Sequence, residues 1–130
     1  PNAAIASDGP LMPFGESKPH PRSYGTFPRV LGKYVRESNV ISLEEAIRKM
    51  TSLPAKIISL NKRGLIKEGY YADITIFDPE KISDNATFQD PHQYSSGVEY
   101  VIVNGQIVVS DGVHNLSKPG RVLYGPGKVD

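Results

Sequence analysis

The sequence predicts an α/β chain in which a helical first half is followed by a half made of strands. Three observations support this fold class. Segments before residue 64 repeat apolar residues at the spacing of an amphipathic helix face. Residues 72–77 alternate in the manner of a strand. Two later apolar runs flank an Asn-Gly pair, which favours a hairpin. We therefore expect two units, residues 1–63 and residues 64–130.

Composition limits the class of protein. The 130 residues hold 15 Lys and Arg against 14 Asp and Glu, and a net charge of +1 argues against nucleic acid and membranes as partners. No apolar run reaches the ~20 residues that span a bilayer. Because Cys is also absent, we expect a soluble, cytoplasmic protein. The missing initiator Met and the low hydrophobic content of 38% predict a fragment of a larger protein.

The first element expected is a short strand. Residues 3–6 are small and apolar and run into a Ser-Asp-Gly-Pro turn, which places Asp8 at the carboxyl end of that strand. Five prolines and no periodicity then predict a long ordered loop over residues 10–28. Ordered loops of this length are often functional in compact enzymes.

Three helices should follow this loop. The first would begin at a Thr26 N-cap and present one apolar face. The second, residues 42–51, opens with a Ser-x-x-Glu capping box. The third would run from Pro54 to about Leu60, with Asn61 as a left-handed C-cap. The buried stripe of the second helix would consist of Leu43, Ala46, Ile47 and Met50.

The second half opens with a turn and a strand. Gly64 and Gly69 bracket a tight turn with extended pieces on both sides, and the strand over residues 72–77 ends at an Asp-Pro pair. Residues 80–97 show no period. A loop of this length should either pack over another segment or be disordered.

A hairpin is the clearest strand signal. Residues 98–103 and 106–110 should pair through a type I′ turn at Asn104 and Gly105. Residues 121–124 would add one short strand. So few strands leave a sheet edge and a sheet face uncovered, which predicts a partner that is either the missing N-terminal part of the protein or a second copy.

Two motifs read together carry a family resemblance. They are Ala-Ser-Asp-Gly at residues 6–9 and His-Pro-Arg-Ser-Tyr-Gly-Thr-Phe-Pro-Arg-Val-Leu-Gly at residues 20–32. With residues 64–79, they make the chain resemble the C-terminal part of the N-acyl-D-amino-acid deacylases, the D-aminoacylase branch of the amidohydrolase superfamily. The resemblance implies that residues 1–63 supply the last strand, a substrate loop and helices of a TIM-like barrel. Residues 64–130 would then belong to a small β-sandwich.

The resemblance implies a catalytic role for Asp8. In this family the aspartate after the last barrel strand takes a proton from metal-bound water and delivers it to the leaving amine, two steps that suit a carboxylate. Zn²⁺ would be held mainly by His residues on earlier strands, with Asp8 as a weak additional ligand. The structural alternative is an Asp that caps a turn before Gly.

The resemblance also implies that an arginine of the loop binds the substrate carboxylate. Arg22 is the first candidate and Arg29 the second, although Arg22 could instead pin its own loop. Gly9 and His20 complete the substrate-binding set. His20 could orient Arg22 or ligate metal, but a lone His is more often a surface hydrogen-bonding residue.

The predicted activity belongs to the complete protein. The three histidines lack the spacing of a zinc site and Cys is absent, so the isolated chain should bind no zinc and be inactive. The sequence thus predicts the C-terminal part of a zinc-dependent hydrolase that converts small-molecule N-acyl-D-amino acids to a carboxylate and a free D-amino acid. Two alternatives stay open: an amidohydrolase acting on a cyclic amide, and a non-catalytic binding module that recruits a partner through its sheet edge.

Overall fold

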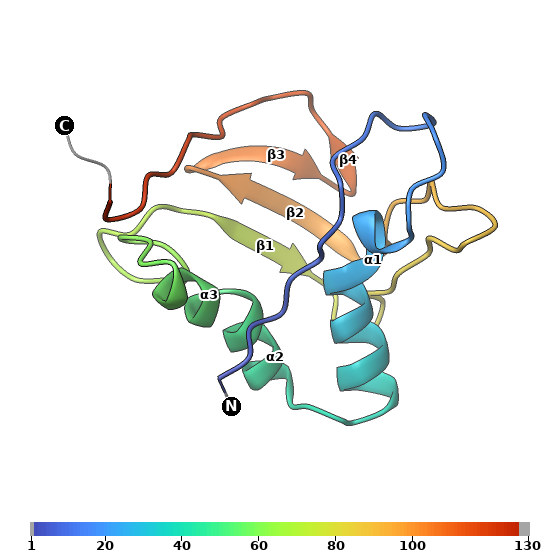
Figure 1. Ribbon diagram of the computed structural model, residues 1–130, viewed down its shortest axis with the longest axis horizontal. Coiled ribbons are helices and arrows are strands. Elements are labelled where there is room, and N and C mark those ends of the chain that lie inside the picture. Colours follow the sequence, from blue (N-terminus) through green and yellow to red (C-terminus); the bar gives the residue numbers. More distant parts are fainter. Residues whose placement is uncertain (1, 128–130) are drawn as a thin grey trace.

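The structure, a computed structural model, describes residues 2–127 and places helices before strands, as predicted (Figure 1). No helix in this part of the chain has the length and apolarity needed to cross a membrane. The helices are α1 (Arg22–Arg29), the π-helix η1 (Val30–Glu37), α2 (Leu43–Met50) and α3 (Ser52–Ile57). The strands are β1 (Ile74–Phe77), β2 (Val98–Val103), β3 (Gln106–Ser110) and β4 (Val113–His114).

The first helix begins earlier than the sequence predicts. α1 starts at Arg22, and its first turn is closed by a 3.0 Å hydrogen bond from the Gly25 amide to the Pro21 carbonyl. Thr26 is not an N-cap, because its Oγ1 donates to the Arg22 carbonyl at 2.9 Å from within the helix. The predicted loop over residues 10–28 was therefore too long at its C-terminal end.

Pro28 lies inside α1, where a proline removes one backbone donor. The carbonyl that loses its partner belongs to Tyr24, four residues earlier. Ser95 Oγ donates to this carbonyl at 3.1 Å. The helix then widens into η1, as in the 2.9 Å bond from the Ser38 amide to the Lys33 carbonyl. A side chain from a distant loop thus compensates for the proline.

α2 confirms the predicted helix and the Ser42 half of the predicted capping box. Ser42 Oγ accepts a hydrogen bond from the Glu45 amide at 3.2 Å. The Glu45 carboxylate pairs with Arg48 at 2.5 Å, and this hydrogen bond lowers the pKa of Glu45. Ala46 is fully buried. The rest of the predicted stripe, Leu43, Ile47 and Met50, packs partly buried against the same core.

α3 differs from its prediction at both ends. Pro54 occupies its third position rather than its first. Ser59, not Asn61, takes the left-handed conformation after the helix, with a φ of 55°. The Leu60 amide then donates to the Ala55 carbonyl at 2.8 Å, which is the hydrogen bond of a Schellman cap.

The four strands form one antiparallel sheet in the order β1-β2-β3-β4. The predicted hairpin is confirmed, because β2 pairs with β3 and the turn residues Asn104 and Gly105 have φ values of 49° and 82°. β1 begins at Ile74 and pairs with β2. Gly64 and Gly69 both have positive φ, as predicted, although no strand precedes Gly64 in the described residues.

Two predicted strands do not form within residues 2–127, namely residues 3–6 and 121–124. Backbone groups of a strand need a neighbouring strand to bond with. Residues 3–6 bond to a helix instead: the Ile5 amide donates to the Lys49 carbonyl at 3.0 Å, and Lys49 Nζ donates to the Ala3 carbonyl at 2.8 Å. The segment predicted as the last barrel strand therefore lies along α2 (Figure 1).

The core lies between the helices and the loop over residues 80–97, which joins β1 to β2. Ile82 of this loop is only 2% exposed. Arg36 of η1 holds the loop by donating to the carbonyls of Pro79 and Ile82 at 2.9 and 2.8 Å. Of the two predicted fates of the loop, packing is therefore the observed one. The buried cluster consists of Val30, Leu31, Ala46 and Ile82.

Candidate active site

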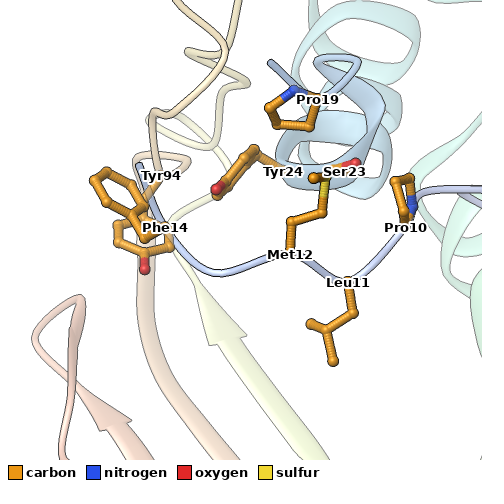
Figure 2. Close-up of a pocket in the computed structure, with 8 residues that line it drawn as sticks. All are labelled: Pro10, Leu11, Met12, Phe14, Pro19, Ser23, Tyr24 and Tyr94. Atoms are coloured by element: carbon orange, nitrogen blue, oxygen red, sulfur yellow. The ribbon is translucent and has the colours of Figure 1, made fainter. Parts of the chain in front are cut away.

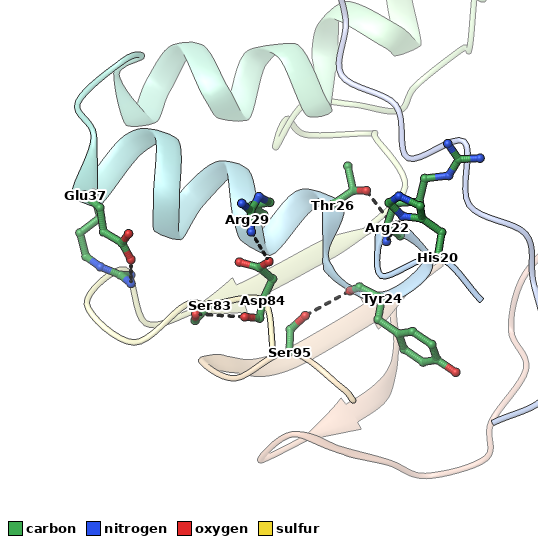
Figure 3. A network of polar contacts seen from close by, with 10 residues as sticks. His20, Arg22, Tyr24, Thr26, Arg29, Glu37, Ser83, Asp84 and Ser95 are labelled. Carbon is green, nitrogen blue, oxygen red and sulfur yellow. Dashed lines mark hydrogen bonds and ion pairs between the residues drawn. The ribbon is translucent and has the colours of Figure 1, made fainter. Parts of the chain in front are cut away.

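Asp8 and Arg22 form an ion pair at the start of α1. Asp8 Oδ2 lies 2.9 Å from Arg22 Nη2, and the side chains are 85% and 43% exposed. Figure 3 shows the Arg22 side chain extending away from the helix beside His20. The structure thus brings together the predicted catalytic carboxylate and the first candidate for binding the substrate carboxylate.

The backbone at Asp8 adopts an uncommon conformation. Its φ of 49° lies in the left-handed region, where residues other than Gly, Asn and Asp are rarely found. Gly9 follows and lies so close to α1 that a Cβ there would be 2.8 Å from Ser23 Cα. Since Gly9 has no side chain, the backbone can pass this close to α1, and the Asp8 carboxylate then reaches Arg22.

His20 supports the backbone of Arg22. Its Nδ1 accepts a hydrogen bond from the Arg22 amide at 3.0 Å, so the proton of the neutral ring is carried by Nε2. The ring also meets Phe88 edge-on, with centroids 4.8 Å apart. His20 therefore links the first turn of α1 to the loop over residues 80–97.

Arg29, the second arginine candidate, is engaged elsewhere. Its Nη1 lies 2.8 Å from Asp84 Oδ2, and this hydrogen bond, together with one to Tyr34, raises the pKa of Arg29 (Figure 3). Asp84 packs so closely on α1 that a Cβ at Gly25 would be 2.7 Å from the Asp84 Cβ. The charge of Arg29 thus holds the loop, which favours Arg22 as the ligand-binding arginine.

A cavity of about 330 Å³ is lined by residues that follow Asp8 and Arg22 in the chain, and Figure 2 shows these lining residues. Its lining includes Pro10, just after the Asp-Gly pair, and Ser23, just after Arg22. Ser23 Oγ is buried without a hydrogen-bond partner among the described residues. The remaining wall is apolar or aromatic and includes Leu11, Met12, Phe14, Pro19, Tyr24 and Tyr94.

The described residues do not form a metal site on their own. Within residues 2–127, no three His, Cys, Asp or Glu side chains are placed to hold an ion. Both ring nitrogens of His92 lie at hydrogen-bond distance from protein atoms, and His114 Nδ1 accepts from the Leu116 amide at 3.1 Å. Asp8 could give at most one ligand to a site built from other residues.

The contribution of the loop over residues 80–97 to this region was not predicted from the sequence. His92, Tyr94 and Ser95 all contact the segment before α1 or α1 itself. The contact between Ser95 and Tyr24 joins residues 71 positions apart, so local spacing carries no information about it. The signal in the sequence was the pair of ring side chains, His92 and Tyr94, among the mostly polar residues that follow Phe88.

Comparisons of sequence agree with these observations. A model described as the amidohydrolase family matches residues 2–109. An N-acyl-D-aspartate deacylase from Alcaligenes xylosoxydans xylosoxydans is 46% identical over 123 residues, which cover 95% of this chain and 24% of that protein. The dihydroorotase of Endomicrobium trichonymphae is 43% identical over 83 residues, or 55% of this chain and 19% of that protein. The chain spans about a quarter of the length of the curated deacylases it matches.

Solved structures share the same arrangement of helices and sheet. A crystal structure of D-aminoacylase superposes with a TM-score of 0.85 at 46% identity, covering 92% of this chain and 25% of that one. An N-acyl-D-glutamate deacylase from Bordetella bronchiseptica, complexed with zinc and a phosphonate inhibitor, superposes with a TM-score of 0.75 at 42% identity. That match covers 81% of this chain and 22% of the other.

Proposed function

Because this chain belongs to the amidohydrolase family, we propose that it is the C-terminal part of a hydrolase that deacylates N-acyl-D-amino acids to a carboxylate and a free D-amino acid. The proposal concerns the complete protein, since the chain spans only 24% of its deacylase relative. Residues 1–63 would complete a TIM-like barrel, and residues 64–130 would form part of a small β-sandwich.

The exposed pair of Asp8 and Arg22 carries this proposal. Asp8 would accept a proton from the attacking water as its oxygen adds to the amide carbon. It would then give this proton to the amide nitrogen as the C–N bond breaks, so that Asp8 ends the cycle ionised. A single carboxylate in reach of both atoms can perform the two transfers.

Arg22 would bind the α-carboxylate of the substrate beside Asp8. A guanidinium carries five N–H donors, and the contact with Asp8 engages Nη2 only, so donors remain for a substrate. Gly9 would serve the site by permitting the close approach to α1, and His20 by fixing the Arg22 backbone. The bound carboxylate would hold the scissile amide near Asp8.

Zinc is the cofactor we propose for the complete enzyme, because the similar N-acyl-D-glutamate deacylase was solved with zinc. The residues described here do not fit a zinc site by themselves. The ion would therefore take most of its ligands from residues outside this chain, with Asp8 as one ligand at most.

A cyclic amide is the second candidate substrate, because dihydroorotases also resemble the chain. That resemblance covers 55% of the chain, against 95% for the N-acyl-D-aspartate deacylase, so we favour the open-chain amide. A non-catalytic module is disfavoured, because the similar proteins named above are enzymes.

The full-length protein is expected to hydrolyse N-acetyl-D-amino acids and to leave their L-enantiomers largely intact. The measurement is kcat/KM from release of the free amine, with N-acetyl derivatives of D- and L-aspartate, glutamate and leucine. Dihydroorotate is assayed beside them as the cyclic amide. Faster turnover of dihydroorotate would move the protein to the second candidate, and turnover of neither would point to a non-catalytic module.

Arg22→Ala is expected to raise KM for N-acetyl-D-amino acids by about 10- to 100-fold with a smaller effect on kcat, because a charge-assisted bidentate contact is lost. Substrates without a carboxylate should be affected less. Arg29→Ala is the comparison variant. Because Arg29 pairs with Asp84 rather than with Asp8, its loss should raise KM much less than the loss of Arg22 does. An equal rise in KM for both variants would contradict the role of Arg22.

A further inference from the structure

The cavity beside Asp8 and Arg22 is open to solvent and lined from three segments of the chain. Residues 10–14 form one side, Pro19 with the first turn of α1 the second, and Tyr94 the third (Figure 2). Leu11 is fully exposed at this cavity, and more than half of the Phe14 and Tyr94 surfaces also remain exposed. Apolar side chains gathered at an open cavity indicate an apolar binding partner.

Stacked rings form the wall of this cavity. Phe14 stacks on Tyr94 with centroids 4.9 Å apart and meets Tyr24 edge-on at 6.1 Å. Tyr24 and Tyr94 are themselves 5.8 Å apart. Each ring comes from a different segment, so the wall depends on how these segments are held together.

His92 holds the wall. Its Nε2 donates to the Ser17 carbonyl at 3.1 Å, which leaves Nδ1 as the acceptor. Nδ1 accepts from the Gly15 amide at 3.2 Å and from Tyr24 Oη at 2.9 Å. One imidazole therefore ties α1 to the residues that follow Phe14. Ser17 has a φ of 61°, an uncommon conformation that needs such outside contacts.

Ser23 gives the cavity one polar group. Its Oγ is buried and without a partner in the described residues, which is unfavourable for a hydroxyl. Arg22 directly precedes Ser23, and Gly9 lies against the Ser23 backbone. An oxygen of a ligand held at Arg22 would satisfy this hydroxyl.

We infer that this cavity is the subsite for the apolar group of the substrate, the acyl chain or the apolar side chain of an N-acyl amino acid, and that His92 is the positioning residue of its wall. The inference rests on the proposed function, because it places the substrate carboxylate on Arg22. A volume of about 330 Å³ lies at the small end of ligand-binding pockets and leaves room for an aliphatic group next to that anchor.

The test uses the full-length protein and two series of substrates. One lengthens the acyl group of N-acyl-D-alanine from acetyl to propionyl to butyryl, and the other lengthens the side chain of N-acetyl-D-alanine by the same steps. In the series that enters the cavity, kcat/KM should rise about fourfold per methylene. Phe14→Ala should lower this increment below about twofold. Phe27→Ala should retain it, because Phe27 is an exposed aromatic of α1 outside the cavity lining.

The role of His92 is tested in the same series. His92→Phe keeps a ring beside Phe14 but removes both nitrogens, and it should lower the methylene increment as Phe14→Ala does while sparing kcat for the acetyl compound. His92→Asn, whose Oδ1 can accept in place of Nδ1, should recover at least half of the increment. An equal loss of kcat for every substrate would overturn the positioning role.

Other outcomes separate the inference from the proposed function. Hydrolysis of N-acetyl-D-amino acids with the same increment in the wild type, Phe14→Ala and Phe27→Ala would overturn the inference and leave the function standing. A wild-type kcat/KM that does not change with added methylenes in either series would also overturn the inference and leave the function standing. A folded wild-type protein that hydrolyses no N-acyl-D-amino acid would overturn both.

Discussion

Replacing Asp8 with asparagine in the full-length protein is expected to lower kcat by about 10² to 10⁴. The amide keeps the size of the carboxylate but cannot accept a proton and return it. Asn also tolerates a φ of 49°, so the turn before Gly9 should be retained. The measurement is kcat at saturating N-acetyl-D-amino acid, with folding and metal content checked on the same samples.

Asp111→Asn is the matched control for this substitution. Asp111 also precedes a glycine and has a φ of 51°, but it lies in the turn after β3, outside the candidate active site. Its variant should keep wild-type kcat. A folded, metal-loaded Asp8→Asn enzyme with full activity would leave Asp8 as a turn residue only.

Gly97→Ala is expected to cause the largest loss of stability. Its φ of 80° is unfavourable for alanine by about 1–2 kcal/mol. A Cβ there would also lie 2.5 Å from the Ile82 amide nitrogen and 2.6 Å from its Cα. Ile82 is buried in the core and cannot move aside, which adds about 1–3 kcal/mol. The free energy of unfolding should fall by about 2–5 kcal/mol.

Gly105→Ala separates the two causes. Gly105 has a φ of 82°, but a Cβ there would meet nothing within 4 Å. This variant should lose only the backbone contribution, about 1–2 kcal/mol. The measurement is urea unfolding of the full-length protein followed by circular dichroism. Equal unfolding midpoints for the two variants would show that the contact between Gly97 and Ile82 contributes nothing.

The sequence predicts those elements whose signals act over a few residues. The Ser42 cap and the Asn104-Gly105 turn are local, and α2 and the hairpin were placed correctly. The start of α1 was missed because its proline is compensated by Ser95, 71 positions from the carbonyl that it satisfies. The strand predicted over residues 3–6 does not form, because backbone groups of this segment bond to α2.

The same difference between local signals and contacts of distant residues applies to the candidate site. The family resemblance drew attention to Asp8 and Arg22, and the structure places them 2.9 Å apart. The cavity was not predicted, because His92 and Tyr94 come from a loop without periodicity. Aromatic stacking between distant segments depends on the completed fold, and no single segment encodes it.

The loop between β1 and β2 also bears on how this chain could be recombined with a relative. It inserts Ile82 among the helices and pairs Asp84 with Arg29. It also places Tyr94 in the cavity lining and brings His92 to Tyr24. A chimera that joins the sheet and this loop of one family member to the helices of another would bring the cavity wall along. If the cavity is the proposed subsite, substrate preference would follow the donor of the sheet in part. A crossover between the helices and the sheet would then separate the loop's share of the wall from Asp8 and Arg22.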